Sequence, residues 1–300
     1  LEKDLSYVSR DKLVFVVMHI PSSLQKKLRY NTLDQDETVN TAALYKLLEG
    51  YNAHIISGHT HFNTNVCFND SLMEHNTAAV CGTWWRADIN VDGTPRGYGI
   101  YEVNGDQLKW IYKSAGYPLE HQFHAYPAGS SDEYPSDIIA NVWNWDDLWK
   151  VEWYENGQRM GEMQKYKGYD PMAKAICSDK EKVKYDWISP VLTEHLFHAT
   201  PHDPNARIEI KVTDRFGNVY TQTIENNMFR NRYFWLLISL FFVLKTEAKV
   251  TLTSIWGDNM VLQQQAEVTF RGKATPGKRV YASASWNHRK IYADCDRNGQ

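Results

Sequence analysis

The sequence has few cysteines, no excess of basic charge and no apolar segment long enough to span a bilayer. Its 300 residues include four cysteines, which are widely spaced and form no Cys-x-x-Cys pair. This spacing excludes a zinc knuckle built on thiolates, and it is compatible with free thiols or with one disulfide. The net charge of −3 and the pI of about 6.4 give no signature of nucleic-acid binding.

Internal repeats and low-complexity tracts are also absent from the sequence. The apolar content of 43% is typical of globular proteins, and 300 residues are enough for about two domains. The 11 tryptophans and 18 tyrosines are often interleaved with polar residues. This pattern suits β-structure whose aromatic side chains face a ligand, and it equally suits ordinary packing within sheets.

Residues 13–60 follow a strand, helix, strand pattern. Continuous apolar runs at residues 13–18 and 53–56 predict two buried strands. Apolar residues spaced along 37–49 predict a helix between them, with Gly50 at the position that a helix C-terminus favours. The pattern therefore predicts a βαβ-like unit, in which ligand-binding groups gather in the loops at the carboxyl ends of the strands.

Three histidines follow these two strands. His19 comes directly after the first strand, and His59 and His61 flank Thr60 after the second. Because both loops lie at strand ends of one βαβ-like unit, the three side chains are predicted to form a single site. Imidazole is a common ligand of first-row transition metals, so this site is a candidate metal centre. Taken singly, His59 or His61 would more often be an ordinary loop histidine.

Short strands joined by turns dominate the sequence after this unit. Asn104-Gly105 separates alternating runs at residues 97–103 and 108–113, which predicts a β-hairpin. Further strand candidates lie at residues 137–141, 149–155, 206–214 and 219–224. They predict a small antiparallel β-domain, most simply a sandwich.

The segment after Met228 has the composition of a secretory signal peptide. Arg230 and Arg232 precede a twelve-residue apolar run at residues 233–244, and small residues follow at a cleavage-like spacing. Twelve residues are too few to span a bilayer, which needs roughly 17 to 25. A buried core segment is the alternative interpretation. A signal peptide inside a chain indicates that two coding regions have been joined, with the second beginning at Met228.

Three motifs together resemble the carboxyl-terminal half of a calcineurin-like metallophosphoesterase. They are His19-Ile20-Pro21 at the end of the first strand, the loop Ser57-Gly58-His59-Thr60-His61, and Cys81-Gly82-Thr83-Trp84-Trp85-Arg86 followed by the strand at 97–102. The resemblance covers about residues 1–224. It is strongest to bacterial members with an extra β-domain after the catalytic domain, and it implies an α/β fold, a partial α/β sandwich followed by antiparallel β-domains.

In that family, two divalent metal ions hold the substrate phosphate and activate a bridging hydroxide for in-line attack. The resemblance implies that His19 and His59 bind one metal and His61 the other, without distinguishing Mn, Fe and Zn. It also places Trp84 and Arg86 near the mouth through which a phosphoester substrate enters. Arg86 can meet a phosphate with two hydrogen bonds, although surface packing explains this residue equally well.

The sequence also departs from the family pattern. The remaining family ligands come from Asp-x-His, Gly-Asp-x-x-(Asp or Asn) and Gly-Asn-His-(Asp or Glu) motifs, and none occurs in the eighteen residues before His19. Without the bridging carboxylate and the general acid, no catalytic residue is assigned. We therefore expect a metal-dependent phosphoesterase of phosphomonoesters or phosphodiesters, present as an incomplete and inactive fragment. The alternative is a β-rich binding or scaffold protein in which the histidines are relics.

Other polar residues are interpreted as structural. His54 lies within an apolar strand and is expected in the core or on a sheet face. Five histidines are expected in solvated loops, the first three in spite of a metal-like spacing: His195, His198, His202, His121 and His124. Four carboxylates are likewise expected to be solvated loop charges: Asp132, Glu133, Asp146 and Asp147.

A second resemblance begins after Ala248. Residues 252–264 and 272–280 resemble the opening β-module of bacterial sialate O-acetylesterases. The similarity ends before the Gly-Gln-Ser-Asn nucleophile motif of that family, so no esterase chemistry is assigned.

Four parts are therefore expected along the chain. They are residues 1–116, the carboxyl-terminal half of a phosphoesterase domain; 117–227, its β-rich domain; 228–248, the signal-like segment; and 249–300, the start of the esterase-like module. The signal-like segment and the family resemblance together predict an exported protein, periplasmic or at the cell surface. Its expected partner is a phosphoester substrate.

Overall fold

The computed structural model describes residues 1–23, 38–183, 185–225, 251–252, 269–283 and 289–298. The chain divides into two units, Leu1–Tyr233 and Phe234–Gln300. The signal-like segment at 228–248 and most of the esterase-like stretch at 252–264 lie outside the described residues. Those two expectations, and the four domain boundaries, stay predictions from the sequence.

The first sheet of the larger unit contains both strands that precede the candidate histidines. Its strand order is β1 (Leu13–Val17), β2 (Asn52–Ser57), β4 (Leu72–Asn76) and β3 (Thr64–Asn69). β1, β2 and β4 run parallel, whereas β3 pairs with β4 in the antiparallel sense. Helix α3 (Thr41–Leu48) joins β1 to β2, so the predicted strand, helix and strand are all present. Leu48 packs with Val14 and Ile55 in the core beneath this sheet.

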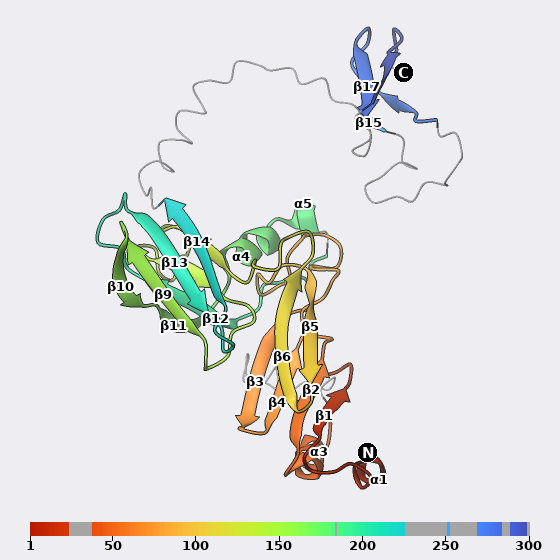
Figure 1. Cartoon of the computed structure of the whole chain (residues 1–300). Helices are drawn as coiled ribbons and strands as arrows, with labels where there is room; N and C mark the ends of the chain where they lie inside the picture. Colours follow the sequence, from red (N-terminus) through yellow and green to blue (C-terminus); the bar gives the residue numbers. More distant parts are fainter. Residues whose placement is uncertain (24–37, 184, 226–250, 253–268, 284–288, 299–300) are drawn as a thin grey trace. The chain divides into compact units, whose positions relative to one another are not determined.

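A β-hairpin packs on this sheet, as Figure 1 shows. Strands β5 (Gly97–Asn104) and β6 (Gln107–Ser114) pair in register around Asn104-Gly105, which confirms the predicted hairpin. Trp110 of β6 lies against the rings of His54 and His75, with centroids 5.8 Å and 4.6 Å away. The hairpin therefore buries the polar face of the first sheet.

Two antiparallel sheets follow in the same unit. One has the order β10 (Gln158–Glu162), β9 (Lys150–Glu155), β13 (Arg207–Thr213) and β14 (Val219–Glu225). The other has the order β11 (Gln164–Gly168), β12 (Thr193–Ala199), β8 (Ile138–Asn141) and β7 (His124–Tyr126). Apolar residues that alternate along these strands form a common core, which includes Ile138, Trp153, Phe197, Ile208 and Ile210.

Short helices complete this unit in its described part. α1 (Glu2–Leu5) precedes β1, while α4 (Pro171–Ser178) and α5 (Lys180–Val183) lie between β11 and β12. Helix α4 begins where the Asp170 side chain accepts a hydrogen bond from the backbone N–H of Ala173, with proline at the first helical position.

The expected α/β sandwich is wrong. The described residues form mostly antiparallel sheets, and their four helices are only four to eight residues long. The reason lies in the connections after β2. A parallel crossover needs a dozen or more residues, whereas β3 and β4, like β5 and β6, are joined by two-residue turns that reverse the chain. Parallel pairing is therefore confined to β1, β2 and β4.

The second unit has two small antiparallel pairs in its described residues. β15 (Thr251–Leu252) pairs with β16 (Gly272–Lys273), and β17 (Arg279–Ser283) pairs with β18 (Lys290–Asp294). An exposed ion pair of 2.6 Å joins Arg279 to Asp294 across the second pair. In the described part of the chain, every helix is too short or too polar to cross a membrane.

Candidate functional site

The loops after β1 and β2 lie side by side. Met18 donates a backbone hydrogen bond to Ile56, and Gly58 donates one to the carbonyl of His19 (both 3.0 Å). As a result, Nε2 of His19 lies 3.1 Å from Nδ1 of His59, with the two exposed rings nearly perpendicular at 76°. The structure thus brings these two imidazoles together at the carboxyl ends of the adjacent parallel strands β1 and β2.

Glu74, on β4, forms hydrogen bonds to the loop after β1 and to the end of β2. Its fully buried carboxylate accepts hydrogen bonds from the backbone N–H groups of Ser22 (2.8 Å) and Ser23 (2.7 Å). It also accepts hydrogen bonds from the hydroxyl of Ser22 (2.8 Å) and from that of Ser57 (2.7 Å). A buried carboxylate with four donors fixes the loop after β1 against the end of β2.

Sequence reasoning did not find Glu74. The strand that carries it reads Leu-Met-Glu-His-Asn, which has neither an apolar run nor an alternating pattern. All five of its residues are buried. β4 lies between β2 and β3, Leu72 packs in the apolar core, and the β5–β6 hairpin covers His75.

His61 has other neighbours. Its Nδ1 atom lies 3.4 Å from the carbonyl oxygen of Gly82 and 3.7 Å from Sγ of Cys81. Its ring stacks on Trp84 with centroids 4.4 Å apart. Burial lowers the pKa of His61, and the nearby imidazoles of His59 and His19 lower it further. His61 is therefore close to the pair but turned toward the segment at residues 81–84.

The loop residues at this site have an unusual backbone. Four of the six non-glycine residues with positive φ in the described chain lie here: His59 (71°), His61 (55°), Trp84 (47°) and Trp85 (63°). A left-handed conformation costs such residues roughly 1 to 2 kcal/mol each. Strain of this kind concentrates at functional sites, where the surrounding structure maintains it.

These residues fit a divalent metal only in part. The facing nitrogens of His19 and His59 are suitable ligands for a first-row metal. However, the described residues contain no group of three or more His, Cys, Asp or Glu side chains placed to hold one ion. The binuclear centre implied by the family resemblance is thus not formed by the described side chains.

Arg86 and Trp84 lie beside the histidine loops. Trp84 is half-buried between His61 and Trp187, whose ring meets it edge-on at 4.7 Å. Arg86 is exposed, and its guanidinium carbon lies 5.5 Å from the ring centroid of Tyr185. Of the two residues predicted to contact a substrate, Trp84 therefore touches a candidate ligand, whereas Arg86 is exposed and contacts Tyr185.

Among the remaining histidines, His54 is buried on a sheet face, as predicted. Its Nδ1 atom lies 2.9 Å from Nε2 of His75. Nδ1 of His75 in turn lies 2.8 Å from Oδ1 of Asn65. Burial lowers the pKa of His54 to about 4 and that of His75 to about 3. Both imidazoles are therefore neutral at pH 7.

The expectation of solvated loops is wrong for three of the five histidines. His124 is half-buried in β7, and the other two are His195 and His198. Both belong to β12, and His195 is buried between Asn141 (2.7 Å) and Asp92 (3.2 Å). His198 lies 2.6 Å from the carboxylate of Asp137. Strand pairing between β8 and β12 places these side chains against polar partners, which spacing alone does not reveal.

The expectation for the carboxylates is wrong for Asp146 alone among the four. Asp146 is buried and accepts a hydrogen bond of 2.8 Å from Nε of Arg215. By contrast, the neighbouring Asp147 is exposed. Asp132 is exposed and forms an ion pair of 2.6 Å with Lys174.

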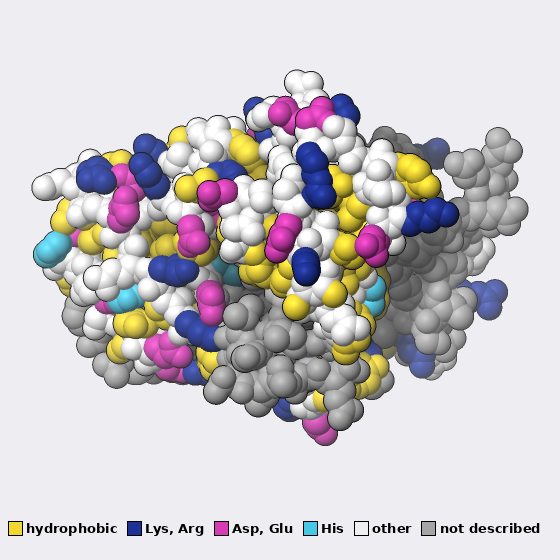
Figure 2. Space-filling model, turned by 90° about the horizontal axis from the view of Figure 1, so that it is seen from below, with side chains coloured by type: hydrophobic (Ala, Val, Ile, Leu, Met, Phe, Trp, Pro, Cys, Tyr) yellow, Lys and Arg dark blue, Asp and Glu magenta, His cyan; other side chains and the backbone are white. Residues whose placement is uncertain are grey.

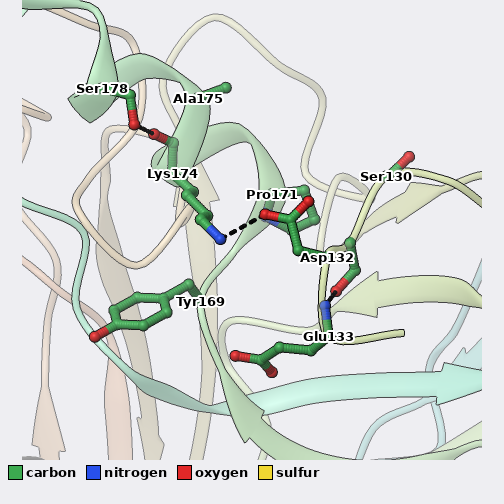
Figure 3. A pocket seen from close by; sticks show the side chains of 9 residues that line it. Ser130, Asp132, Glu133, Tyr169, Pro171, Lys174, Ala175 and Ser178 are labelled. Atoms are coloured by element: carbon green, nitrogen blue, oxygen red, sulfur yellow. Dashed lines mark hydrogen bonds and ion pairs between the residues drawn. The ribbon is translucent and has the colours of Figure 1, made fainter. Parts of the chain in front are cut away.

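Two pockets lie away from the histidines. One of about 300 Å³ is lined by Asp132, Glu133, Tyr169, Lys174 and neighbouring serines. Figure 3 shows the Lys174 ammonium group directed at Asp132 across this pocket, so its charge is already neutralised. The other, of about 440 Å³, lies between the β5–β6 hairpin and β14. Neither contains one of the three candidate ligands.

One face of the molecule carries charges of both signs. Figure 2 shows Lys and Arg side chains mixed with Asp and Glu side chains over one face. This mixture agrees with the small net charge of −3.

Comparison with known proteins identifies one relation. A search of curated proteins and a search of solved structures returned no match. One family model matches residues 74–220, a segment that begins after His19, His59 and His61 and includes Trp84 and Arg86. That model is described as the C terminal of calcineurin-like phosphoesterase, which relates this chain to the phosphoesterases.

Proposed function

We propose that the chain is part of a metal-dependent phosphoesterase that hydrolyses phosphomonoester or phosphodiester bonds at a binuclear metal centre. The family match over residues 74–220 supports the phosphoesterase relation. The observation that carries the metal site is the approach of His19 to His59 at 3.1 Å, at the carboxyl ends of two adjacent parallel strands. In this proposal His61 is a further ligand.

Two metals would polarise the phosphate and supply a hydroxide nucleophile, which is the chemistry such centres provide. The residues of this chain have simpler roles. His19 and His59 bind metal, Glu74 fixes their loops, and Arg86 and Trp84 contact the substrate. The sequence predicts an inactive fragment because the carboxylate ligands that hard divalent ions favour are missing. Any turnover that three imidazoles support should therefore be slow, and metal binding should be weak.

The full chain tests this proposal directly. Zn²⁺ binding is measured by calorimetry, and hydrolysis of bis(4-nitrophenyl) phosphate is followed with Zn²⁺ or Mn²⁺ present. We expect stoichiometric zinc binding and a metal-dependent rate, both lost in His59→Ala. His202→Ala is the matched control, because that side chain is 75% exposed and pairs with Glu155. Zinc binding that His59→Ala leaves unchanged would contradict the metal site and favour the non-catalytic scaffold.

Export is a separate proposal, which rests on the sequence of residues 228–248. The basic residues, the apolar run and the small residues that follow support cleavage after Ala248, in a periplasmic or cell-surface protein. Similarity to the sialate O-acetylesterase module supports an exported product beginning at Lys249. Amino-terminal sequencing of the secreted fraction tests it, and recovery of one intact chain of full mass would contradict it.

A further inference from the structure

An aromatic surface borders the histidine loops. It consists of Trp84, Trp85, Tyr185 and Trp187, and the name aromatic surface refers to these four residues below. Trp85 exposes 74% of its area and Trp187 exposes 60%. Large exposed aromatic side chains gathered at one place are typical of binding sites, since leaving them in water is unfavourable.

The rings form a continuous row that begins at His61. Trp84 stacks on His61 at 14°, and Trp187 meets Trp84 edge-on at 86° with centroids 4.7 Å apart. Tyr185 then stacks on Trp187 at 23°, with centroids 5.5 Å apart. The row therefore leads directly away from one candidate metal ligand.

Buried residues hold this row in place. Ile188, next to Trp187, packs in one apolar cluster with Phe62, the residue after His61, and with Val183. Trp84 packs against the same cluster. This core fixes the segment that carries Tyr185 and Trp187 against the loop of the candidate ligand, although the two are far apart in the sequence.

The backbone of the aromatic surface has an unusual conformation at two residues. Trp84 and Trp85 both have positive φ, at 47° and 63°, which is uncommon for bulky side chains. The strained turn leaves Trp85 largely exposed rather than buried. A costly conformation that presents an apolar ring to water indicates a role in binding.

Arg86 adds a positive charge at the same place. It follows Trp85, is exposed, and lies over the ring of Tyr185 at 5.5 Å. A guanidinium group binds phosphate oxygens through two parallel hydrogen bonds. An anion and a flat apolar group can therefore be held together at this surface.

We propose that the aromatic surface is a subsite for the leaving group of the phosphoester, and that it selects esters whose alcohol or phenol carries a planar aromatic ring. This inference rests on the proposed function. Stacking of a ring on an exposed indole stabilises the complex, while Arg86 contacts the phosphate beside it. An ester with a small aliphatic alcohol would lose the stacking and keep the phosphate contact.

Binding of two non-hydrolysable probes tests the subsite without turnover. Phenylphosphonate and methylphosphonate are titrated into the full chain by calorimetry, with and without Zn²⁺. We expect phenylphosphonate to bind about tenfold more tightly. In Trp85→Ala and Trp187→Ala the ratio of the two affinities should fall toward one, with the affinity for methylphosphonate unchanged. Tyr7→Ala is the control, since Tyr7 is 78% exposed and precedes the opposite end of β1.

Three outcomes would overturn the subsite: equal affinities in the unmodified chain, a preference that survives both tryptophan substitutions, or binding of neither probe. Failure of the proposed function has a different signature. It would appear as absent metal-dependent hydrolysis and absent zinc binding. A preference for phenylphosphonate in the same protein would then show that the aromatic surface binds planar rings without serving a phosphoesterase.

Discussion

Nδ1 of His59 and Nε2 of His19 face each other at 3.1 Å, although 40 positions separate them in the sequence. In a neutral pair at this distance the N–H of one ring donates a hydrogen bond to the lone pair of the other. A metal ion would replace that proton and use a lone pair from each ring. The two histidines are therefore expected to act as one ligand unit rather than as two independent ligands.

This coupling predicts non-additive losses of zinc affinity. His19→Ala and His59→Ala should each weaken zinc binding more than tenfold, and the double variant should be little weaker than either single one. Calorimetry at pH 7.5 measures the three affinities, with His202→Ala as the control. If the two single losses simply add, then His19 and His59 do not share one ion.

The hydrogen bonds of Glu74 predict that one substitution lowers both the free energy of unfolding and the affinity for zinc. Glu74→Ala leaves the buried N–H groups of Ser22 and Ser23 without their acceptor. We expect it to lower the free energy of unfolding by at least about 3 kcal/mol and to weaken zinc binding as well. Urea denaturation and zinc titration measure the two effects. Glu102→Ala, on exposed β5, should change neither.

An unchanged zinc affinity in folded Glu74→Ala would show that the carboxylate stabilises the sheet without positioning His19. The comparison is informative only because Glu74 touches the serines of the loops and neither histidine.

The buried pair of His54 and His75 predicts that the folded chain becomes less stable as the pH falls. Their pKa values in the folded chain, about 4 and about 3, lie below the value near 6.5 of an unfolded chain. As the pH falls through 6.5, the unfolded chain therefore binds protons that the folded chain does not. Stability should decline from about pH 6.5 to about pH 4, by up to about 1.4 kcal/mol per pH unit for each histidine.

Urea denaturation between pH 7.5 and pH 4.5, followed by tryptophan fluorescence, measures this slope. His54→Gln should reduce it, because glutamine does not titrate. A slope that is the same in the unmodified chain and in His54→Gln would assign the acid sensitivity to other groups.

The region around Gly93 joins the two halves of the larger unit. Gly93 has a φ of +83°, and a Cβ atom there would overlap the carboxyl group of Asp170. Asp170 is fully buried and accepts hydrogen bonds from Tyr126 and Asn141, so it has no room to move.

Gly93→Ala should therefore cost well over 2 kcal/mol in unfolding free energy. Gly116→Ala is a matched control, because Gly116 has the same φ and open space around it. That control isolates the left-handed strain, about 1 kcal/mol. Equal losses in the two variants would exclude a steric role for Asp170.

The sequence predicted local structure better than tertiary contacts. Asn104-Gly105 was sufficient for the β5–β6 hairpin because the turn depends only on those residues and their alternating flanks. The parallel strands β1 and β2 were recognisable as apolar runs. β4 was not, since its burial comes from a neighbouring sheet strand and from Trp110, both remote in the sequence.

At the candidate site, too, the sequence was sufficient for strand ends and insufficient for contacts between residues remote in the sequence. Strand ends placed His19 near His59 from the sequence alone, because adjacent parallel strands share one edge. No local pattern could place Trp187 beside Trp84, since that contact depends on the packing of Ile188 against Phe62. The roles of the three histidines, Trp84 and Arg86 stay predictions until binding is measured.

Asp146 and Asp147 are neighbours in the sequence but differ in burial, so their substitution tests how burial determines the contribution of a carboxylate to stability. Asp146 is buried and pairs with Arg215, whose guanidinium carbon lies 4.7 Å from the ring centroid of Trp110. Asp146→Ala would leave Arg215, only 19% exposed, without its partner, and should cost about 3 kcal/mol in unfolding free energy. Asp147→Ala should cost less than about 0.5 kcal/mol, because that side chain is exposed. Urea denaturation of both variants measures the difference, and similar values would mean that the Asp146–Arg215 pair contributes little because its desolvation offsets its attraction.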